Sequence, residues 1–214
     1  MVLVGDSVFA QVAREFFQFD SAYDVVAFSV ERSFLKRDKK DGLPVLPFEE
    51  LAQLCPPDSH SVFVAIVFTQ FNRLRARLYR EAKARGYSMA SYISSAARIR
   101  PHATLGEHCF ICEQAVVQPL SAIGNNVVIW SGNQICHRTR IEDHTFILPN
   151  CIISDGVTIG AHGIVGANVT IESDCVVGED CYLGPATVID DDVPPRSVIE
   201  RAPTGMAPEI PLSS

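Results

Sequence analysis

The sequence predicts a small α/β domain over residues 1–90, an all-β parallel β-helix over residues 91–194 and a C-terminal tail over residues 195–214. Three observations predict this class. Apolar runs with strand spacing alternate with helical patterns in the first ninety residues. In the second half an aliphatic residue recurs at every sixth position, and the residue four positions after each aliphatic one is nearly always small. A period this strict is the signature of a solenoid.

The elements of the first domain follow from its apolar runs. Strands are expected at Val2–Val4, Val25–Val30, Ser61–Phe68 and Tyr87–Ile93, and helices over residues 7–17 and 72–85. The charged segment 31–44 ends in Gly-Leu-Pro and is expected to be an exposed loop. Short strands that alternate with helices favour a parallel sheet with crossover connections. We therefore expect a small Rossmann-like domain.

The turn after the first strand is a candidate substrate-binding site. Gly5, Asp6 and Ser7 lie between the end of a strand and the start of a helix, which is where open α/β folds bind nucleotides. Only one of the three is a glycine, so the turn lacks the glycine-rich dinucleotide fingerprint. An ordinary strand-to-helix turn remains an equal alternative. The basic residues of the helix at 72–85 also allow two interpretations, a solvated surface or a phosphate-binding surface.

The repeat determines how the second half is built. The aliphatic positions run in steps of six from Ile93 to Ile189, and all seventeen are Ile, Leu or Val. Each follows a small residue by two positions, so on a short strand both point to the same, inward side. Gly, Asn and Asp lie between these pairs, where they suit corners. Each unit therefore forms one side of a triangular prism, and three units of six residues form one coil.

Composition narrows the partners and the compartment. The formal charge of −7 argues against a nucleic-acid partner. The most apolar run is far shorter than the ~20 residues of a membrane span, and the N-terminus resembles no secretion signal. Seven cysteines, an odd number, indicate reduced thiols and a cytoplasmic protein. Four of them are expected to pack inside the prism: Cys109, Cys151, Cys175 and Cys181.

The chain resembles the hexapeptide-repeat sugar acyltransferases of the sialic acid O-acetyltransferase and nucleotide-sugar N-acetyltransferase type. The resemblance covers nearly the whole chain and is sharpest at Trp130–His144, Ser154–Gly160, Gly166–Asn168 and Val193–Val198. It implies a left-handed β-helix, a homotrimer, and transfer of an acyl group from acetyl-CoA or a related acyl-CoA to an amino or hydroxyl group of a sugar. It also implies that the first domain recognises the sugar or its nucleotide.

The same resemblance implies which residues form the site. The family's general base is a histidine that corresponds to His137, and an imidazole, which titrates near neutral pH, suits that task. Asp155 lies one coil further along the chain, so we expect it above His137, where it would orient the ring. Backbone N–H groups at glycine-rich corners are expected to bind the oxyanion. The residues expected to contact CoA are Phe146, Gly156, Gly166 and Asn168.

Two departures from the family keep another class of protein open. Arg138 follows the histidine where these relatives often have a glutamate. Phe146 stands where they have a second histidine near CoA. If these changes abolish the chemistry, the chain is a non-catalytic scaffold or binding protein.

A metal site is the third interpretation. His108, His144 and His162 share one column of the prism because they are whole coils apart. The γ-type carbonic anhydrases bind zinc between β-helices through three histidines, but Pro149 stands where their third histidine would be. We therefore expect no metal, and we expect this column to be polar corner surface at a subunit contact.

Overall fold

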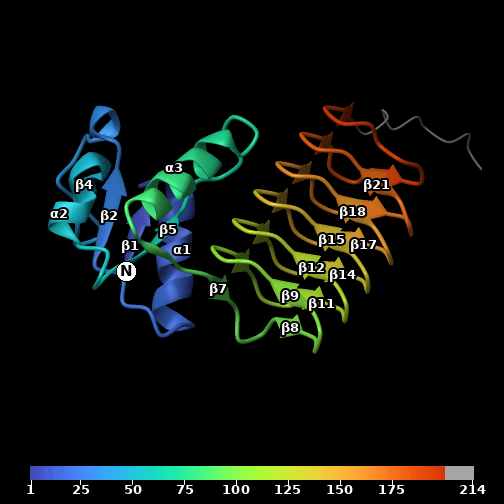
Figure 1. The fold of residues 1–214 in the computed structure, drawn as a ribbon, viewed down its shortest axis with the longest axis horizontal. Helices are drawn as coiled ribbons and strands as arrows, with labels where there is room; N and C mark the ends of the chain where they lie inside the picture. Colours follow the sequence, from blue (N-terminus) through green and yellow to red (C-terminus); the bar gives the residue numbers. More distant parts are fainter. Residues whose placement is uncertain (201–214) are drawn as a thin grey trace, which may run out of the picture.

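The computed structural model describes residues 1–200 and contains an α/β domain beside a triangular β-helix (Figure 1). The sheet of the first domain has the strand order β3-β4-β2-β1-β5-β6 and is parallel except for the β3–β4 pair. The elements of this domain are β1 (Val2–Val4), α1 (Val8–Phe19), β2 (Ala27–Val30), η1 (Arg32–Phe34), β3 (Lys39–Lys40), β4 (Leu43–Pro47), η2 (Phe48–Glu50), α2 (Leu51–Leu54), β5 (Ser61–Val64), α3 (Arg73–Ala84) and β6 (Ser88–Met89).

The segment 31–44, expected to be a loop, contributes regular structure. The 3-10 turn η1 follows β2, and β3 and β4 form a hairpin whose turn residues Asp41 and Gly42 have φ angles of 48° and 81°. β4 then pairs with β2 in parallel, so the sheet gains a strand that we did not expect. The sequence did not predict β4 because proline is rare inside sheets, and this strand contains Pro44 and Pro47.

Two other expected strands are shorter or divided. β5 ends at Val64, and the apolar residues that follow it leave the sheet. Gln70, Phe71 and Asn72 have φ angles of 53°, 50° and 61°, so this connection folds back tightly before α3. The expected strand at 87–93 becomes two: β6 completes the first sheet, and β7 (Tyr92–Ile93) begins the β-helix.

The β-helix has one parallel sheet on each side of the prism. The sheet that faces the first domain, here called the domain-facing sheet, consists of β7, β10 (Phe110–Ile111), β13 (Val128–Ile129), β16 (Phe146–Ile147), β19 (Ile164–Val165), β22 (Tyr182–Leu183) and β24 (Val198–Ile199). The second sheet consists of β8 (Arg98–Ile99), β11 (Val116–Val117), β14 (Gln134–Ile135), β17 (Ile152–Ile153), β20 (Thr170–Ile171) and β23 (Val188–Ile189). The third sheet consists of β9 (Thr104–Leu105), β12 (Ala122–Ile123), β15 (Arg140–Ile141), β18 (Thr158–Ile159) and β21 (Val176–Val177).

Strand pairing confirms the predicted coil. Phe110 is aligned with Val128, and Val128 with Phe146, so neighbouring strands of a sheet are one coil of three units apart. The β-helix extends past position 194, where we expected its end, because β24 pairs with β22 after a shortened coil. The expected tail beyond residue 200 lies outside the described residues.

The interior of the prism is formed by the predicted columns. Ile111, Ile135 and Ile159 point inward and have no exposed surface. Burying one such side chain stabilises the fold by about 1.5–3 kcal/mol. The four cysteines expected beside them are buried and free, with exposed fractions of 0–6%. These predictions are confirmed.

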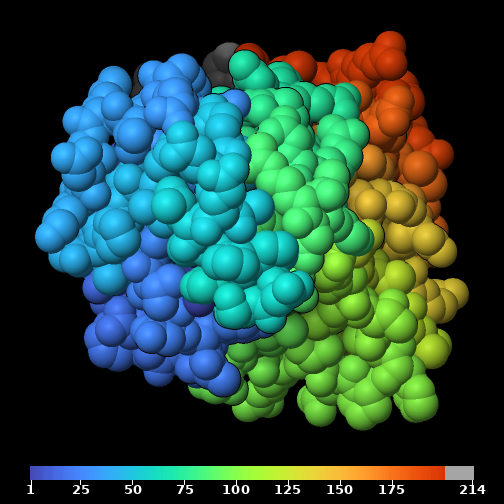
Figure 2. All heavy atoms as spheres, turned by 60° about the vertical axis from the view of Figure 1, so that its left-hand side comes forward, coloured from blue at the N-terminus to red at the C-terminus, as the bar shows by residue number. Residues whose placement is uncertain are grey.

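The first domain packs on the outer face of the domain-facing sheet, where α1 lies along the prism (Figure 1). In Figure 2 the first domain, including α3, lies against the flank of the β-helix. Phe9 of α1 contacts Phe110 and Trp130 at ring-centroid distances of 5.4 and 5.8 Å, and Phe16 contacts Tyr92 at 5.2 Å. Such aromatic pairs contribute about 0.5–1.5 kcal/mol each beyond the area that they bury.

The histidine column is part of this junction, not a polar surface or a subunit contact as we expected. His108, His144 and His162 have exposed fractions of 1%, 9% and 9%, because the first domain covers them. Within residues 1–200 no group of three or more metal-ligating side chains could hold a metal ion. The rings instead take part in a buried network of hydrogen bonds.

Hydrogen bonds fix the protonation of this network. The Val64 N–H donates to Nε2 of His108 at 2.7 Å, so this nitrogen carries no proton. Nδ1 then carries it and donates to Oδ1 of Asn126 at 2.9 Å, and the Asn126 amide donates to Nδ1 of His144 at 2.8 Å. Both imidazoles must be neutral for these bonds to form. Burial lowers the pKa of His108 to about 3, and burial and the nearby His162 lower that of His144 to about 4.

Arg75 of α3 crosses the same junction. Its guanidinium is fully buried and donates through Nη2 to Oδ1 of Asn72 at 3.1 Å and to the His144 carbonyl at 2.8 Å. It also lies 5.3 Å from the centre of the Phe146 ring. Burial lowers the pKa of Arg75 to about 9, so it stays charged near neutral pH.

Ion pairs occupy much of the basic face of α3. Arg73 contacts Asp180 of the β-helix at 2.5 Å, and Lys83 pairs with Glu107. Arg77 contacts Glu31 at 2.9 Å. Of the two interpretations of this helix, the phosphate-binding one loses its support, because these charges are already paired within the chain.

Candidate active site

His137 and Asp155 lie on the corner between the second and third sheets, one coil apart. We call this the dyad corner; it comprises residues 101–102, 119–120, 137–138, 155–156 and 173–174. The Gly156 N–H donates to the His137 carbonyl at 3.0 Å, which aligns the two coils. Oδ1 of Asp155 lies 2.9 Å from Nδ1 of His137. The contact that the spacing predicted is present.

This contact determines which nitrogen of His137 can react. A carboxylate beside Nδ1 holds the proton on that nitrogen and leaves the lone pair on Nε2. The side chains of His137 and Asp155 are 53% and 37% exposed, so the dyad is open to a ligand. The pair can therefore accept a proton at Nε2 and stabilise the imidazolium that results.

Arg138, where relatives often have a glutamate, takes no part in orienting the ring. It is exposed, with a φ angle of 59°, and its side chain has no hydrogen bond or ion pair to any described residue. Asp155, one coil above, is the residue in contact with the imidazole.

The two candidate glycines have structural reasons to be glycine. Gly156 has a φ angle of 72°, and a Cβ there would lie 2.2 Å from Oδ1 of Asp174. A Cβ on Gly166 would lie 2.6 Å from the Pro185 nitrogen of the next coil. The N–H groups of both glycines donate to carbonyls of neighbouring coils. We expected backbone N–H groups at glycine-rich corners to bind the oxyanion. The N–H groups of Gly156 and Gly166 are not free to do so.

Asn168 and Phe146, also expected near CoA, lie in different surroundings. Asn168 is exposed on the corner between the domain-facing and second sheets. Phe146 is 1% exposed and packs between Phe68, at a centroid distance of 5.2 Å, and the guanidinium of Arg75. Its burial argues against the expected contact with CoA and assigns it to the junction between the domains.

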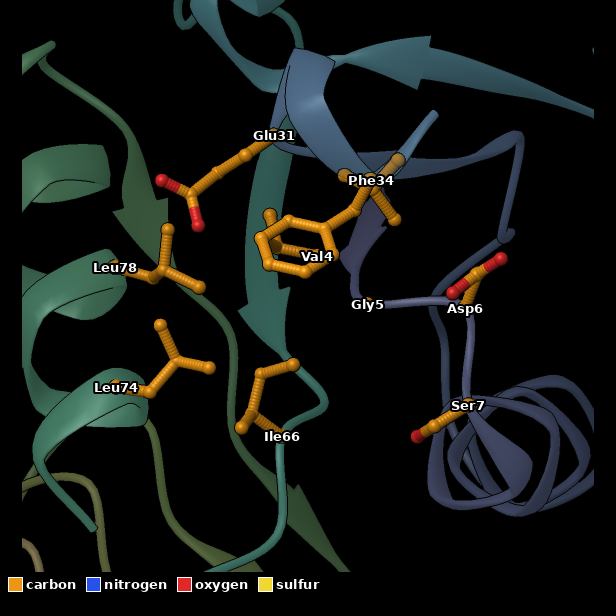
Figure 3. Close-up of a pocket in the computed structure, with 10 residues that line it drawn as sticks. Val4, Gly5, Asp6, Ser7, Glu31, Phe34, Ile66, Leu74 and Leu78 are labelled. Carbon is orange, nitrogen blue, oxygen red and sulfur yellow. The ribbon is translucent and has the colours of Figure 1, made fainter. Parts of the chain in front are cut away.

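A cavity of about 160 Å³ opens at the turn of Gly5, Asp6 and Ser7, where the sequence placed a substrate site (Figure 3). It lies at the carboxyl ends of β1 and β2. Gly5 has a φ angle of 123°, and a Cβ there would lie 2.7 Å from the Ala65 carbonyl oxygen, so only glycine allows this turn. Whole small-molecule ligands need pockets of about 300–1,000 Å³, so the cavity has room for part of such a ligand.

Sequence reasoning missed the other side of this cavity. Figure 3 shows the Glu31 carboxylate, the Phe34 ring and the side chains of Leu74 and Leu78 turned towards the same space. Glu31 directly follows β2. In nucleotide-binding α/β folds, a carboxylate at this position accepts hydrogen bonds from the ribose hydroxyls. The position of Glu31 directly after a strand could have predicted its role from the sequence. We did not predict it, because residues 31–44 were expected to form an exposed loop. Phe34 is 60% exposed and offers a ring on which a flat group can stack.

Within one chain these residues form separate groups. His137, Asp155 and Gly156 share the dyad corner, whereas Gly166 and Asn168 belong to the opposite edge of the second sheet. The cavity at Gly5, Asp6 and Ser7 lies in the other domain. A single copy therefore presents parts of a site and does not bring them together.

Part of the β-helix is similar to a known protein family. Residues 138–173 match the family described as bacterial transferase hexapeptide (six repeats). Over these residues the β-helix is thus similar to that family. No helix among the described residues is long and apolar enough to cross a membrane.

Solved structures share the fold of both parts. PerB from Caulobacter crescentus, in complex with CoA and GDP-perosamine, superposes with a TM-score of 0.84 at 24% identity, covering 94% of this chain and 93% of that chain. The acetyltransferase domain of PglB from Neisseria gonorrhoeae superposes with a TM-score of 0.83 at 22% identity, covering 94% and 95%. The whole described architecture, and not the β-helix alone, is therefore that of these acetyltransferase structures.

Among curated proteins the similarity is more partial. The bifunctional protein GlmU of Enterococcus faecalis is 26% identical over 157 residues, which are 68% of this chain and 30% of that protein. The acyl-[acyl-carrier-protein]–UDP-N-acetylglucosamine O-acyltransferase of Campylobacter concisus is 28% identical over 103 residues, 48% of this chain and 39% of that protein. The chain thus spans less than half the length of these two relatives.

Proposed function

We propose that the protein is an acyltransferase that moves an acetyl or related short acyl group from acyl-CoA to an amino or hydroxyl group of a nucleotide-linked sugar. The observation that carries this proposal is the 2.9 Å contact between Asp155 and Nδ1 of the exposed His137 on a hexapeptide β-helix. Solved structures with the same fold, among them one in complex with CoA and GDP-perosamine, support the choice of substrates.

In this reaction Nε2 of His137 removes the proton from the acceptor's amino or hydroxyl group as that group attacks the thioester carbonyl. The attack forms a bond from nitrogen or oxygen to the carbonyl carbon and places negative charge on the carbonyl oxygen. The tetrahedral intermediate then expels the CoA thiolate, which takes the proton from the imidazolium. Asp155 stabilises the imidazolium while it exists, so its contribution is largest in the transition state.

The first domain supplies the acceptor site in this proposal. We assign it the nucleotide-binding role of a Rossmann-like domain. Gly5 and Ser7 would lie against a phosphate at the start of α1. Glu31 would accept hydrogen bonds from the hydroxyls of the nucleotide's ribose. Arg77 donates to Glu31 at 2.9 Å and holds its carboxylate at the rim of the cavity. Since the cavity accommodates only part of a nucleotide sugar, the sugar would project out of it.

The β-helix supplies the acyl-CoA site. We take its coil to be left-handed and its assembly to be a homotrimer, as the resemblance to hexapeptide acyltransferases implies. The pantetheine arm would run upward from the dyad past the coils that carry Gly156, Gly166 and Asn168. Gly156 and Gly166 would shape the corners that the arm passes, and Asn168 would supply a polar contact. A cytoplasmic location would give access to acyl-CoA.

Release of CoA from acetyl-CoA, measured with a panel of amino sugars and nucleotide-linked sugars, tests the proposal. We expect the wild type to release CoA with at least one nucleotide-linked sugar, and His137→Ala to do so about 10²–10⁴-fold more slowly. Acetyl-CoA affinity should be the same in both proteins, which separates loss of the base from loss of binding. Bound acetyl-CoA without turnover on any acceptor would instead favour a binding protein.

A further inference from the structure

Two buried hydroxyl groups lie inside the prism at the dyad corner. Ser121 and Thr139 occupy the small inward position of successive coils, and each is 1% exposed. Oγ of Ser121 donates a hydrogen bond to the Cys136 carbonyl of the next coil at 2.7 Å. Oγ1 of Thr139 donates to the Ser154 carbonyl at 3.1 Å. Each of these two carbonyls belongs to the residue that immediately precedes a member of the dyad.

The bond from Ser121 completes the backbone bonding of the turn that carries His137. The Cys136 N–H donates to the Ile153 carbonyl at 2.9 Å, and the His137 carbonyl accepts the Gly156 N–H at 3.0 Å. The Cys136 carbonyl is directed into the prism, where the Ser121 hydroxyl bonds it. Because a peptide group is planar, a bond to this carbonyl also fixes the nitrogen of His137.

The turn that carries Asp155 is bonded in the same way. The Ser154 N–H donates to the Ile171 carbonyl at 3.0 Å, and the Asp155 carbonyl accepts the Asp174 N–H at 2.8 Å. The Thr139 hydroxyl bonds the remaining group, the Ser154 carbonyl. Both members of the dyad therefore start from peptide groups whose orientation an interior hydroxyl fixes.

Within residues 1–200 this column of inward positions has hydroxyls only at these two levels. The equivalent position below the turn of Gln118 is Ala103, and the one below the turn of Glu172 is Val157. A buried carbonyl that lacks a donor costs free energy, so a hydroxyl at such a position stabilises the orientation of the peptide that it bonds. The positions of the column without a hydroxyl are Ala103, Val157, Cys175 and Val193.

The same kind of bond occurs on another corner, away from the dyad. Thr145 has no exposed surface, and its Oγ1 donates to the Glu142 carbonyl at 2.9 Å and the Gly160 carbonyl at 3.4 Å. Interior hydroxyls are therefore a general means of fixing corners in this prism. The two at the dyad corner differ in what their corner carries.

We infer that Ser121 and Thr139 are positioning residues for the dyad, an inference that rests on the proposed function for its catalytic consequence. Their hydroxyls bond backbone carbonyls and act on His137 and Asp155 through the two turns. The 2.9 Å contact between Asp155 and Nδ1 of His137 joins side chains of different coils, so it requires both turns to stay in place. Loss of either hydroxyl would let one turn rotate and weaken that contact.

Steady-state kinetics tests this inference on the active enzyme. Thr139→Val removes the hydroxyl and retains the shape, and we expect kcat to fall about tenfold while KM for acetyl-CoA changes less than about twofold. Ser121→Ala should behave alike, and Thr139→Ser, which retains the hydroxyl, should keep the wild-type kcat. Thr145→Val is the matched control and should also keep it. Equal kcat values for Thr139→Val and Thr145→Val would overturn the inference.

A double-mutant cycle separates positioning from a general loss of stability. If Thr139 acts through Asp155, adding Thr139→Val to Asp155→Asn should lower kcat by less than about twofold, because the contact is already lost. A further tenfold fall in the double variant would mean that Thr139 acts independently of Asp155, and would overturn its assignment as a positioning residue.

The tautomer of His137 tests the same inference without turnover. In protein labelled with ¹⁵N-histidine, ring nitrogen shifts at a pH well above the ordinary imidazole pKa distinguish a proton on Nδ1 from one on Nε2, and His137→Ala identifies the signal. We expect the Nδ1–H form in the wild type and in Thr145→Val, and a mixture of both forms in Thr139→Val and Ser121→Ala. Wild-type shifts in the latter two would overturn the inference. An inactive wild type would refute the proposed function alone, because the tautomer still decides the positioning.

Discussion

The hydrogen-bonded histidines at the junction predict that acid weakens the fold. The Val64 N–H donates to Nε2 of His108 at 2.7 Å, so a proton on that nitrogen would face another donor. Burial lowers the pKa of His108 from 6.5 to about 3. Between these two values the unfolded chain binds more protons than the folded chain, so stability falls as the pH falls. The contribution of His108 is complete above about pH 6.5 and is lost progressively towards pH 3.

The size of the effect follows from the two pKa values. At pH 5 the unfolded histidine is almost fully protonated and the folded one is almost fully neutral, which costs about 2 kcal/mol relative to pH 7.5. Urea unfolding at pH 7.5 and pH 5.0 measures this loss. Trp130 is the only tryptophan and lies 5.8 Å from Phe9 of the other domain, so its fluorescence reports on the junction.

The matched control is His108→Gln, whose amide can accept the Val64 hydrogen bond but does not titrate. The free energy of unfolding of this variant should fall by about 2 kcal/mol less than that of the wild type over the same pH interval. The other titrating groups are common to both proteins and cancel in the comparison. Equal losses in the two proteins would contradict the assignment of a neutral, buried His108.

Two further predictions concern single positions. Gly5→Ala should destabilise the first domain by about 2–4 kcal/mol, because its φ angle of 123° strains any other residue and its Cβ would lie 2.7 Å from the Ala65 carbonyl oxygen; a Tm equal to that of the wild type would contradict this. Of the seven cysteines only Cys136 is partly exposed, so one thiol per chain should react with Ellman's reagent faster than the other six in the native state, and Cys136→Ser should remove that reaction. Persistence of a fast-reacting thiol in Cys136→Ser would show that a buried cysteine is accessible.

Sequence reasoning predicted the β-helix almost completely because its period is strict. Every sixth residue from Ile99 to Ile189 packs in the interior of the prism, and this spacing alone predicts that Asp155 lies over His137. A one-residue insertion anywhere between them would have broken that alignment. The solenoid therefore turns spacing in the sequence into position in space, which few folds allow.

The surroundings of each corner were less predictable, because they depend on what the first domain covers. His108 was expected on the surface and is buried, and Phe146 was expected at CoA and packs against Arg75. Both residues follow the repeat correctly, so the period holds no information about which side of the prism is covered. β4 was missed for a local reason, since Pro44 and Pro47 concealed its strand character. Contacts between parts of a chain are thus the information that a repeat pattern lacks.

The central claim is that His137, oriented by Asp155, is the base of an acyl transfer. The most direct measurement is kcat for acetyl transfer by Asp155→Asn, beside the wild type, with the product followed by mass spectrometry so that the thiol of Cys136 does not interfere. The contact at 2.9 Å predicts that kcat falls by about a hundredfold or more, while the Tm and the affinity for acetyl-CoA are retained. A kcat equal to that of the wild type would show that Asp155 does not act through His137, and would contradict the account.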